Sequence, residues 1–248
     1  MSPTGVLPSM KRHYYAHHSL SLARKMEMLV FGYAGARVLA FPTSMGRFYD
    51  WEDRGLVGVL GQHLENGWIQ LFCVDSVDAE SWYDKEKLPR ERAKRYSQYD
   101  HYLLEELLPF SATLNGNPFV MAVGANFGAY HALNFSFRHP EIVERVIGMS
   151  GYYDIKRLTD GYSDDGVYFN NPTDFMLHEH DRERLEAIRH IDIILATGRA
   201  DSGCGNNEYL SRILWEKNIW HALRVWDGVA HDWSSWAQML RLYIAGHD

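Results

Sequence analysis

Cysteine, basic charge and long apolar runs are scarce or missing in this 248-residue sequence. Its two cysteines, Cys73 and Cys204, lie far apart in no metal-type spacing, which favours a reduced, cytoplasmic protein with Cys73 as a buried filler. No apolar run approaches the length of a bilayer crossing, and the first fifteen residues contain no apolar segment of the signal-peptide kind. We therefore expect neither a membrane span nor a signal peptide.

Basic residues are outnumbered, with 25 Lys and Arg against 32 Asp and Glu, which argues against a nucleic-acid-binding face. Neither G-x-G-x-x-G nor G-x-x-x-x-G-K-[ST] occurs, so nucleotide binding has no support. His178, His180 and His190 are scattered without a third ligand at helical spacing, so we predict no metal site. No repeat, low-complexity segment or linker interrupts the chain, which predicts one domain over residues 1–248.

The most informative stretch is V-M-A-V-G-A-N-F-G-A-Y-H-A at residues 120–132. It begins as a short apolar run typical of a buried strand, and a helix is predicted to follow the glycines at 124 and 128. A strand, a tight turn flanked by glycines and a helix form the context of the nucleophile elbow, G-x-S-x-G. The central residue here is Asn126 rather than serine. The sequence therefore predicts an acyl-transfer scaffold that lacks the hydroxyl expected at its tip.

Apolar runs alternate with amphipathic segments along the chain, which predicts an α/β fold with a doubly wound, mostly parallel sheet. The predicted strands are residues 13–22, 26–31, 37–41, 68–74, 119–123, 142–149, 191–197 and 222–226. The predicted helices are residues 51–65, 88–110, 129–136, 208–217 and 233–245. Residues 32–35 are typical of a hairpin turn between the second and third strands. Residues 152–181 have no clean period and are predicted to be a lid-like insertion.

Four predicted strand-end loops carry candidate site residues, because ligands of such sheets bind at the carboxyl ends of strands. These residues are Ser44 and Met45, Asn126, Asp201, and His231. The order of nucleophile position, acid and histidine is that of the α/β-hydrolases. His231 is placed to reach the elbow side chain, and Asp201 to hold the other imidazole nitrogen. Asp192, within a strand, and Asp227, at the head of the His231 loop, are weaker candidates for the acid.

Several longer motifs resemble the putative-esterase branch of the α/β-hydrolases, which is related to the esterase D and antigen 85 mycolyltransferase types. They are G-A-N-F-G-A-Y-H-A at 124–132, F-R-H-P-E at 137–141, V-I-G-M-S-G-Y-Y-D-I at 146–155, V-Y-F-N-N-P-T-D-F at 167–175 and H-D-W-S-S-W at 231–236. The resemblance runs from about residue 26 to the end. It implies ester hydrolysis or acyl transfer without a metal or organic cofactor, and a small-molecule ester or acid as ligand.

The resemblance also implies roles for individual residues. It puts the nucleophile at position 126, the base at His231 and the acid at Asp201. The oxyanion would be held by the Phe127 N–H and by an amide of the Ser44 and Met45 loop. The sequence departs from the family at Asn126 and in the Ser202-Gly203-Cys204-Gly205 loop.

An asparagine amide cannot replace a serine hydroxyl, because its nitrogen lone pair is delocalised. Three explanations remain open. The chain is a natural pseudo-hydrolase that binds an ester, acid or partner; or it is an esterase whose serine was replaced to trap a complex or a resting state; or Asn126 becomes an Asp nucleophile through water activated by His231. Asparagine tolerates the positive φ of an elbow, so the turn should survive. Cys204 would need a nearby base to act as a nucleophile instead.

A non-enzymatic interaction protein is the alternative from another class. Aromatic residues crowd the insertion and its neighbours: Tyr152, Tyr153, Tyr162, Tyr168, Phe169 and Phe175. They would line a ligand pocket or a partner face, or simply pack the lid onto the domain. Nothing in the residue types indicates the acyl group of a ligand or the oligomeric state.

Overall fold

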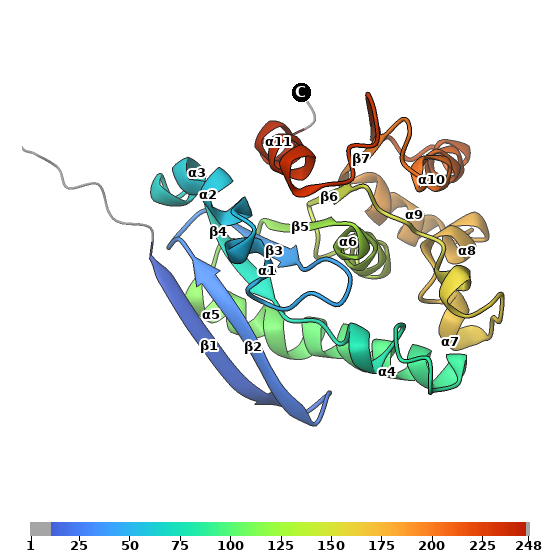
Figure 1. Cartoon of the computed structure of the whole chain (residues 1–248), viewed down its shortest axis with the longest axis horizontal. Helices are drawn as coiled ribbons and strands as arrows, with labels where there is room; N and C mark the ends of the chain where they lie inside the picture. The colour runs from blue at the N-terminus through green and yellow to red at the C-terminus, as the bar shows by residue number, and fades with distance from the viewer. Residues whose placement is uncertain (1–10, 247–248) are drawn as a thin grey trace, which may run out of the picture.

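The computed structural model describes residues 11–246, which form an eight-stranded sheet with helices on both faces (Figure 1). The strands are β1 (Arg12–Ser19), β2 (Arg24–Phe31), β3 (Ala36–Phe41), β4 (Ile69–Val74), β5 (Val120–Ala125), β6 (Arg145–Met149), β7 (Asp192–Gly198) and β8 (Ala222–Trp226). Their order across the sheet is β1-β2-β4-β3-β5-β6-β7-β8. β1, β2 and β4 pair antiparallel and all other neighbours pair parallel. This is the α/β-hydrolase architecture, and the predicted fold class is confirmed.

The predicted hairpin between residues 26–31 and 37–41 is wrong. β4 lies between β2 and β3, pairing antiparallel with β2 and parallel with β3. The hairpin of this region is instead β1–β2, in which Ser19 lies opposite Arg24. Glycines at 32 and 35 both adopt positive φ, as a hairpin turn would require, but here they redirect the chain over the end of β4.

Alternating strand residues face two separate cores, as a pleated sheet requires. Leu39 and Phe41 of β3 belong to one buried cluster, whereas Val38 and Ala40 belong to the other. The first cluster is covered by α4 (Pro89–Tyr102), α5 (Leu108–Leu114), α6 (Phe127–Arg138), α8 (Pro172–Leu177), α9 (Arg182–Arg189) and α10 (Cys204–Glu216). The second is covered by α1 (Asp50–Asp53), α2 (Leu56–Val59), α3 (Gly61–Glu65) and α11 (Trp233–Tyr243).

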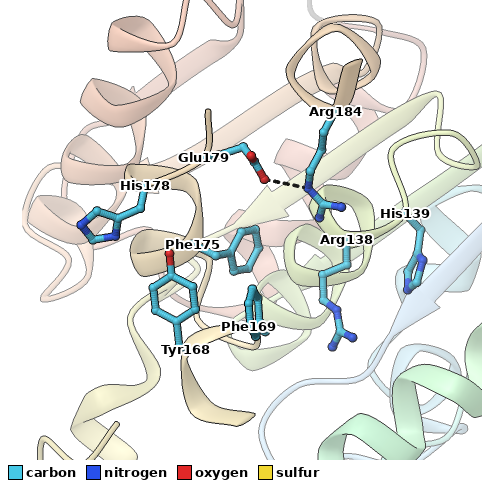
Figure 2. Close-up of a pocket in the computed structure, with 8 residues that line it drawn as sticks. All are labelled: Arg138, His139, Tyr168, Phe169, Phe175, His178, Glu179 and Arg184. Carbon is cyan, nitrogen blue, oxygen red and sulfur yellow. Dashed lines mark ion pairs between the residues drawn. The ribbon is translucent and has the colours of Figure 1, made fainter. Parts of the chain in front are cut away.

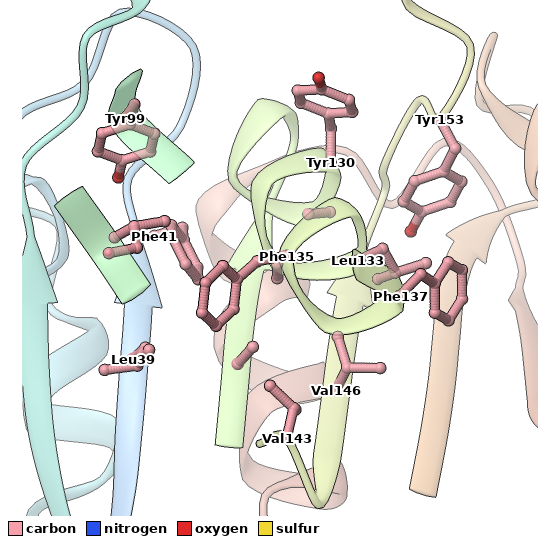
Figure 3. Close-up of a cluster of buried hydrophobic side chains, with 14 of the residues drawn as sticks. Leu39, Phe41, Tyr99, Tyr130, Leu133, Phe135, Phe137, Val143, Val146 and Tyr153 are labelled. Atoms are coloured by element: carbon pink, nitrogen blue, oxygen red, sulfur yellow. The ribbon is translucent and has the colours of Figure 1, made fainter. Parts of the chain in front are cut away.

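The helix after the elbow, α6, is the centre of the first core. Every residue from Phe127 to Phe137 is buried, which is typical of a helix enclosed on all sides. Figure 3 shows Phe135 of this helix on the side of the strand residue Phe41 and Leu133 on the side of Val146, and all four belong to the same buried cluster. The buried helix fixes the position of the elbow, because its first turn cannot shift without disturbing this packing.

Two predicted helices differ from the structure. Residues 51–65 form three short helices rather than one, because the chain turns at Gly55, where φ is 80°. The helix predicted at 88–110 extends to Leu114 through a π-helical turn, η2 (Leu103–Leu107). Pro109 follows that turn and lacks the N–H that regular helical bonding would need.

The insertion at 152–181 contains three short helices of four to six residues: η3 (Ile155–Leu158), α7 (Asp165–Tyr168) and α8. Two of them begin at aspartates whose side chains accept a backbone N–H, from Lys156 to Asp154 and from Val167 to Asp164. Helices this short show no sequence period, which explains why none was predicted. The following helix α9 was also missed. None of the helices among residues 11–246 combines the length and apolar character that a membrane crossing needs.

Candidate active site

The residue at the tip of the elbow, Asn126, has φ 55° and ψ −121°, so the predicted positive φ is confirmed. The flanking glycines leave room for the turn. A Cβ atom at Gly128 would lie 2.6 Å from the carbonyl oxygen of Phe41, and one at Gly124 would lie 2.1 Å from the carbonyl carbon of Gly128. The close contact of strand and helix therefore requires glycine at both positions.

Asn126, His231 and Asp201 form a continuous chain of hydrogen bonds, although 105 residues separate the first two. The Asn126 Nδ2 lies 2.8 Å from His231 Nε2, and His231 Nδ1 lies 2.9 Å from Asp201 Oδ2. Because an amide nitrogen only donates, His231 Nε2 is the acceptor, and its Nδ1–H donates to Asp201. This is the tautomer that a catalytic histidine needs before it accepts a proton.

The carboxylate of Asp201 is held on both sides. Its Oδ1 accepts the Gly203 N–H at 2.9 Å, while Oδ2 faces His231 and the hydroxyl of Thr197 at 3.5 Å. The residue is buried, with a relative exposure of 6%. The other two candidate acids do not approach the imidazole: Asp192 pairs with Arg145 at 2.6 Å at the start of β7, and Asp227 is exposed.

The side-chain oxygen of Asn126 occupies the position expected for an oxyanion. It accepts the Phe127 N–H at 2.7 Å and the Ser44 N–H at 3.3 Å, and the Ser44 hydroxyl also donates to it. Tyr83 in turn donates its hydroxyl proton to Ser44 Oγ at 2.9 Å. Burial raises the pKa of Tyr83, so its hydroxyl remains a proton donor. The donors predicted for the oxyanion therefore converge on the Asn126 side chain.

Met45 does not contribute its amide to this group of donors. Its N–H bonds to Asp78 Oδ2 at 2.9 Å, and its side chain is exposed. One amide of this loop was predicted to hold the oxyanion, and the structure brings that of Ser44 to Asn126. Met45 has φ 60°, and its N–H points to Asp78 rather than to the elbow.

A buried polar network behind the loop was not predicted. Asp78 Oδ1 accepts a bond from His131 Nε2 at 2.9 Å, and His131 Nδ1 lies 3.0 Å from the Tyr96 hydroxyl. Asp78 and His131 are at most 1% exposed. The network joins the loop after β3, the start of α6 and the middle of α4. Its partners are far apart in the sequence, so no local pattern could have revealed it.

Ser150 holds the loop that carries His231. Its hydroxyl donates to the Ala230 carbonyl at 2.8 Å and accepts the Trp236 indole N–H at 3.0 Å. The Trp236 ring also meets the imidazole of His231 edge-on, with centroids 5.4 Å apart. The M-S-G motif after β6 was noted in the sequence, but the role of its serine depends on a loop 80 residues away.

Cys204 is unsuited to replace the missing hydroxyl. Burial raises the pKa of its thiol, with a further contribution from Glu208, so the thiol stays protonated at neutral pH. Its Sγ lies 4.0 Å from the Glu208 carboxylate, whose negative charge disfavours the thiolate. Among residues 11–246 no group of three or more His, Cys, Asp or Glu side chains is arranged to hold a metal.

A cavity of about 70 Å³ opens beside Asn126 and His231. It is lined by Asn126, Phe127, Ser150, Gly151, Tyr152, Arg157, Asp201, Ser202, Gly203 and His231. The Arg157 guanidinium stacks 4.2 Å from the centroid of the Tyr152 ring. Within the described part of the chain no carboxylate lies within 4 Å of Arg157, so its charge is available to a ligand.

A larger hollow of about 450 Å³ lies at the other end of α6 (Figure 2). Three aromatic rings and two arginines face it, but both arginines are already paired: Arg138 with Asp100 at 3.2 Å and Arg184 with Glu179 at 3.0 Å. A twelve-residue helix is about 18 Å long, which separates this hollow from Asn126. It is not part of the site at the elbow.

Comparisons with known proteins identify the family and the fold of this chain. Residues 69–242 match the family model described as "Putative esterase". No curated protein matches the sequence. The S-formylglutathione hydrolase from Agrobacterium tumefaciens superposes with a TM-score of 0.77 at 12% identity, covering 96% of this chain and 94% of that chain.

Two further structures are similar over nearly their whole length. The CE1 ferulic acid esterase AmCE1/Fae1A from Anaeromyces mucronatus, in complex with ferulic acid, gives a TM-score of 0.71 at 15% identity, covering 98% of this chain and 92% of that chain. Mycobacterium tuberculosis MPT51 (FbpC1) gives 0.67 at 17% identity, covering 92% and 96%. At these identities the likeness establishes the shared fold.

Proposed function

Because this chain belongs to the putative esterase family, we propose that it binds a small carboxylic ester or acid at the Asn126 site without forming an acyl-enzyme at residue 126. The observation that carries this proposal is the hydrogen bonding of the Asn126 amide. Its nitrogen donates to His231 and its oxygen fills the group of oxyanion donors. A delocalised amide nitrogen is not a nucleophile, so His231 has no hydroxyl to activate.

The groups around the amide are arranged as acyl transfer would use them, which supports the proposal. The imidazole has the correct tautomer, Asp201 orients it, and two backbone amides with one hydroxyl point to one position. These features support a site that still recognises a carbonyl or carboxylate group. Entry of a ligand oxygen among these donors requires the Asn126 side chain to turn aside.

The charge beside the cavity supports an acidic ligand. Arg157 is exposed, stacks on Tyr152 and has no carboxylate partner among the described residues, so it would pair with a ligand carboxylate. The Tyr152 ring next to it offers an apolar face to the rest of the ligand. The complex of the Anaeromyces mucronatus esterase with ferulic acid, an aromatic acid, supports the same ligand class.

The test compares the native chain with Asn126→Ser and with the double variant Asn126→Ser/His231→Gln. We expect the native chain to give no His231-dependent hydrolysis of 4-nitrophenyl acetate and no label from a fluorophosphonate probe. The serine variant should take the label and gain at least about a hundredfold in rate, since loss of a triad serine costs about a millionfold in subtilisin. The double variant should lose this gain.

Native turnover that is labelled by the probe and abolished by His231→Gln would refute the proposal. If the folded serine variant stays inactive but still binds aromatic acids, the binding function is supported. The same result would show that the groups around residue 126 no longer support catalysis. The Asn126 site would then be a binding module only.

A further inference from the structure

The Asn126 side chain is bound in its own site in the way that such a site would bind a primary amide substrate. We propose that the site hydrolyses this side chain, converting Asn126 to aspartate in a single self-processing event. The inference rests on the site of the proposed function and adds a modification to it.

The amide oxygen has the surroundings of a reacting carbonyl. Three donors point at Asn126 Oδ1: the backbone N–H groups of Phe127 and Ser44, and the Ser44 hydroxyl. Donors in this position stabilise the negative charge that develops on the oxygen when the carbonyl carbon is attacked. They are held from behind by the buried start of α6, by the Tyr83 bond to Ser44 and by the Met45 bond to Asp78.

The amide nitrogen has the surroundings of a leaving group. Asn126 Nδ2 lies 2.8 Å from His231 Nε2, the atom that would return a proton to it. Asp201, 1% exposed at its side chain, stabilises the imidazolium that forms between the two proton transfers. Both ends of one amide bond are therefore held by the groups that would hydrolyse it.

Space for the attacking water lies beside these atoms. The cavity that Asn126 and His231 line measures about 70 Å³, and a water molecule needs roughly 10–15 Å³ on this measure. Ser150, Ser202 and Asp201 are also lining residues, so polar residues border the cavity.

The step balances without any co-reactant other than water. The water oxygen bonds to Asn126 Cγ while His231 Nε2 takes one water proton, and the oxyanion forms at Oδ1. The Cγ–Nδ2 bond then breaks as His231 returns that proton to Nδ2, releasing ammonia. The new carboxylic acid passes its proton to the ammonia, leaving an aspartate carboxylate at position 126 and an ammonium ion.

The common uncatalysed route to aspartate gives a different product. That route requires the backbone nitrogen of the next residue to attack Cγ and form a succinimide, which opens largely to isoaspartate. Attack by water on Cγ leaves the backbone nitrogen of Phe127 unbonded to Cγ, so hydrolysis directed by His231 should give aspartate with no isoaspartate. The ratio of the two products therefore distinguishes the two routes.

The experiment follows residue 126 in the full-length protein by peptide mass spectrometry, at purification and during incubation at neutral pH in ¹⁸O-labelled water. We expect aspartate at position 126, with one labelled oxygen in molecules converted during incubation, and no isoaspartate. His231→Gln should keep asparagine, whereas the control His178→Gln, on an exposed histidine, should convert like the native chain. Circular dichroism establishes that each variant is folded.

Asparagine that persists in the folded native chain would overturn the inference, as would equal conversion in His231→Gln or a product rich in isoaspartate. The outcome is separable from that of the proposed function. If asparagine persists and Asn126→Ser gains strongly in hydrolysis rate, the self-processing is refuted while the proposed binding site is supported. If residue 126 converts to aspartate and the native chain also shows probe-labelled, His231-dependent hydrolysis, the proposed function is refuted while the self-processing is supported.

Discussion

The backbone amide of Met45 donates a hydrogen bond to the carboxylate of Asp78, with N and Oδ2 2.9 Å apart. The same carboxylate accepts a bond from His131, which lies one turn into the helix after the elbow. One buried side chain thus sets the distance between the loop that carries Ser44 and the helix that carries Phe127. These are the two sources of backbone donors around Asn126.

Asp78→Asn should therefore destabilise the protein and loosen the site. The amide nitrogen of the new residue would face either the Met45 N–H, donor against donor, or His131 Nε2, which could accept only after the imidazole changes its tautomer and its bond to the Tyr96 hydroxyl. We expect a loss of about 2–4 kcal/mol in the free energy of unfolding, measured by urea denaturation. When Asp78→Asn is combined with Asn126→Ser, it should also lower the kcat of ester hydrolysis.

Asp160→Asn is the control for this prediction, because Asp160 is exposed and its φ of 52° suits asparagine. Equal losses of stability in the two variants would contradict the role of Asp78.

Two glycine substitutions should act in opposite directions. Gly128→Ala places Cβ 2.6 Å from two backbone oxygens, of Phe41 and Pro42, so the elbow must move and stability should fall by about 1–3 kcal/mol or more. Gly205→Ala lies in the first turn of α10 with nothing within 4 Å of the added carbon, and it should stabilise by up to about 1 kcal/mol. Thermal unfolding of both variants provides the measurement. A neutral Gly128→Ala would mean that the elbow is looser than described.

Arg157→Gln should weaken the binding of aromatic carboxylates by about tenfold, the equivalent of about 1.4 kcal/mol. Loss of the pairing charge is the cause, so the difference should shrink at high salt. Arg212→Gln is a matched control, because Arg212 also stacks on a tyrosine, Tyr209, at 5.7 Å, but does not line the cavity. Isothermal titration calorimetry with 4-hydroxycinnamate compares the two. Similar affinity losses in both variants would indicate a general effect of charge rather than a contact at the cavity.

Asp232 should contribute stability that depends on pH. It caps α11, accepting the Ser235 N–H and hydroxyl at 2.9 Å each, and these bonds lower the pKa of its carboxyl. A lowered folded-state pKa means that the contribution is present above the unfolded value of about 3.9 and is lost as the pH falls through the folded value. Asp232→Ala should therefore cost about 1 kcal/mol at pH 7 and less in acid.

Asp232→Asn keeps an acceptor at the cap and cannot titrate. Its unfolding free energy at pH 7 should be close to that of the native chain. Urea denaturation across pH 2.5–7 compares the three proteins. A cost of Asp232→Ala that does not change with pH would show that its carboxylate charge contributes nothing to the cap.

Most of the sheet could be predicted from the sequence, because buried parallel strands are continuous apolar runs such as residues 120–123. The positions of Asn126, Asp201 and His231 followed from the same reasoning, since parallel strands bring their carboxyl ends to one edge. The hairpin prediction failed because the order of strands across a sheet depends on residues that are far apart in the sequence. Residues 26–31 and 37–41 are neighbours in sequence, yet β4 inserts between their strands.

The atomic detail of the site could not be predicted in the same way. Which amide of the Ser44 and Met45 loop faces Asn126 depends on the buried carboxylate of Asp78, which lies 33 residues away from Met45. The support of the His231 loop by Ser150 is equally non-local. The orientation of the Asn126 amide follows from these same contacts, because every donor lies on one side of it and the imidazole on the other.

The turn at Asn126 takes its shape from the glycines on either side and from the buried helix that follows, and not from the atoms at its tip. An exchange of asparagine for serine at this position should therefore leave the fold intact. The asparagine codons AAT and AAC differ at a single base from the serine codons AGT and AGC. One base change thus separates a codon for Asn126 from a codon for serine at the elbow.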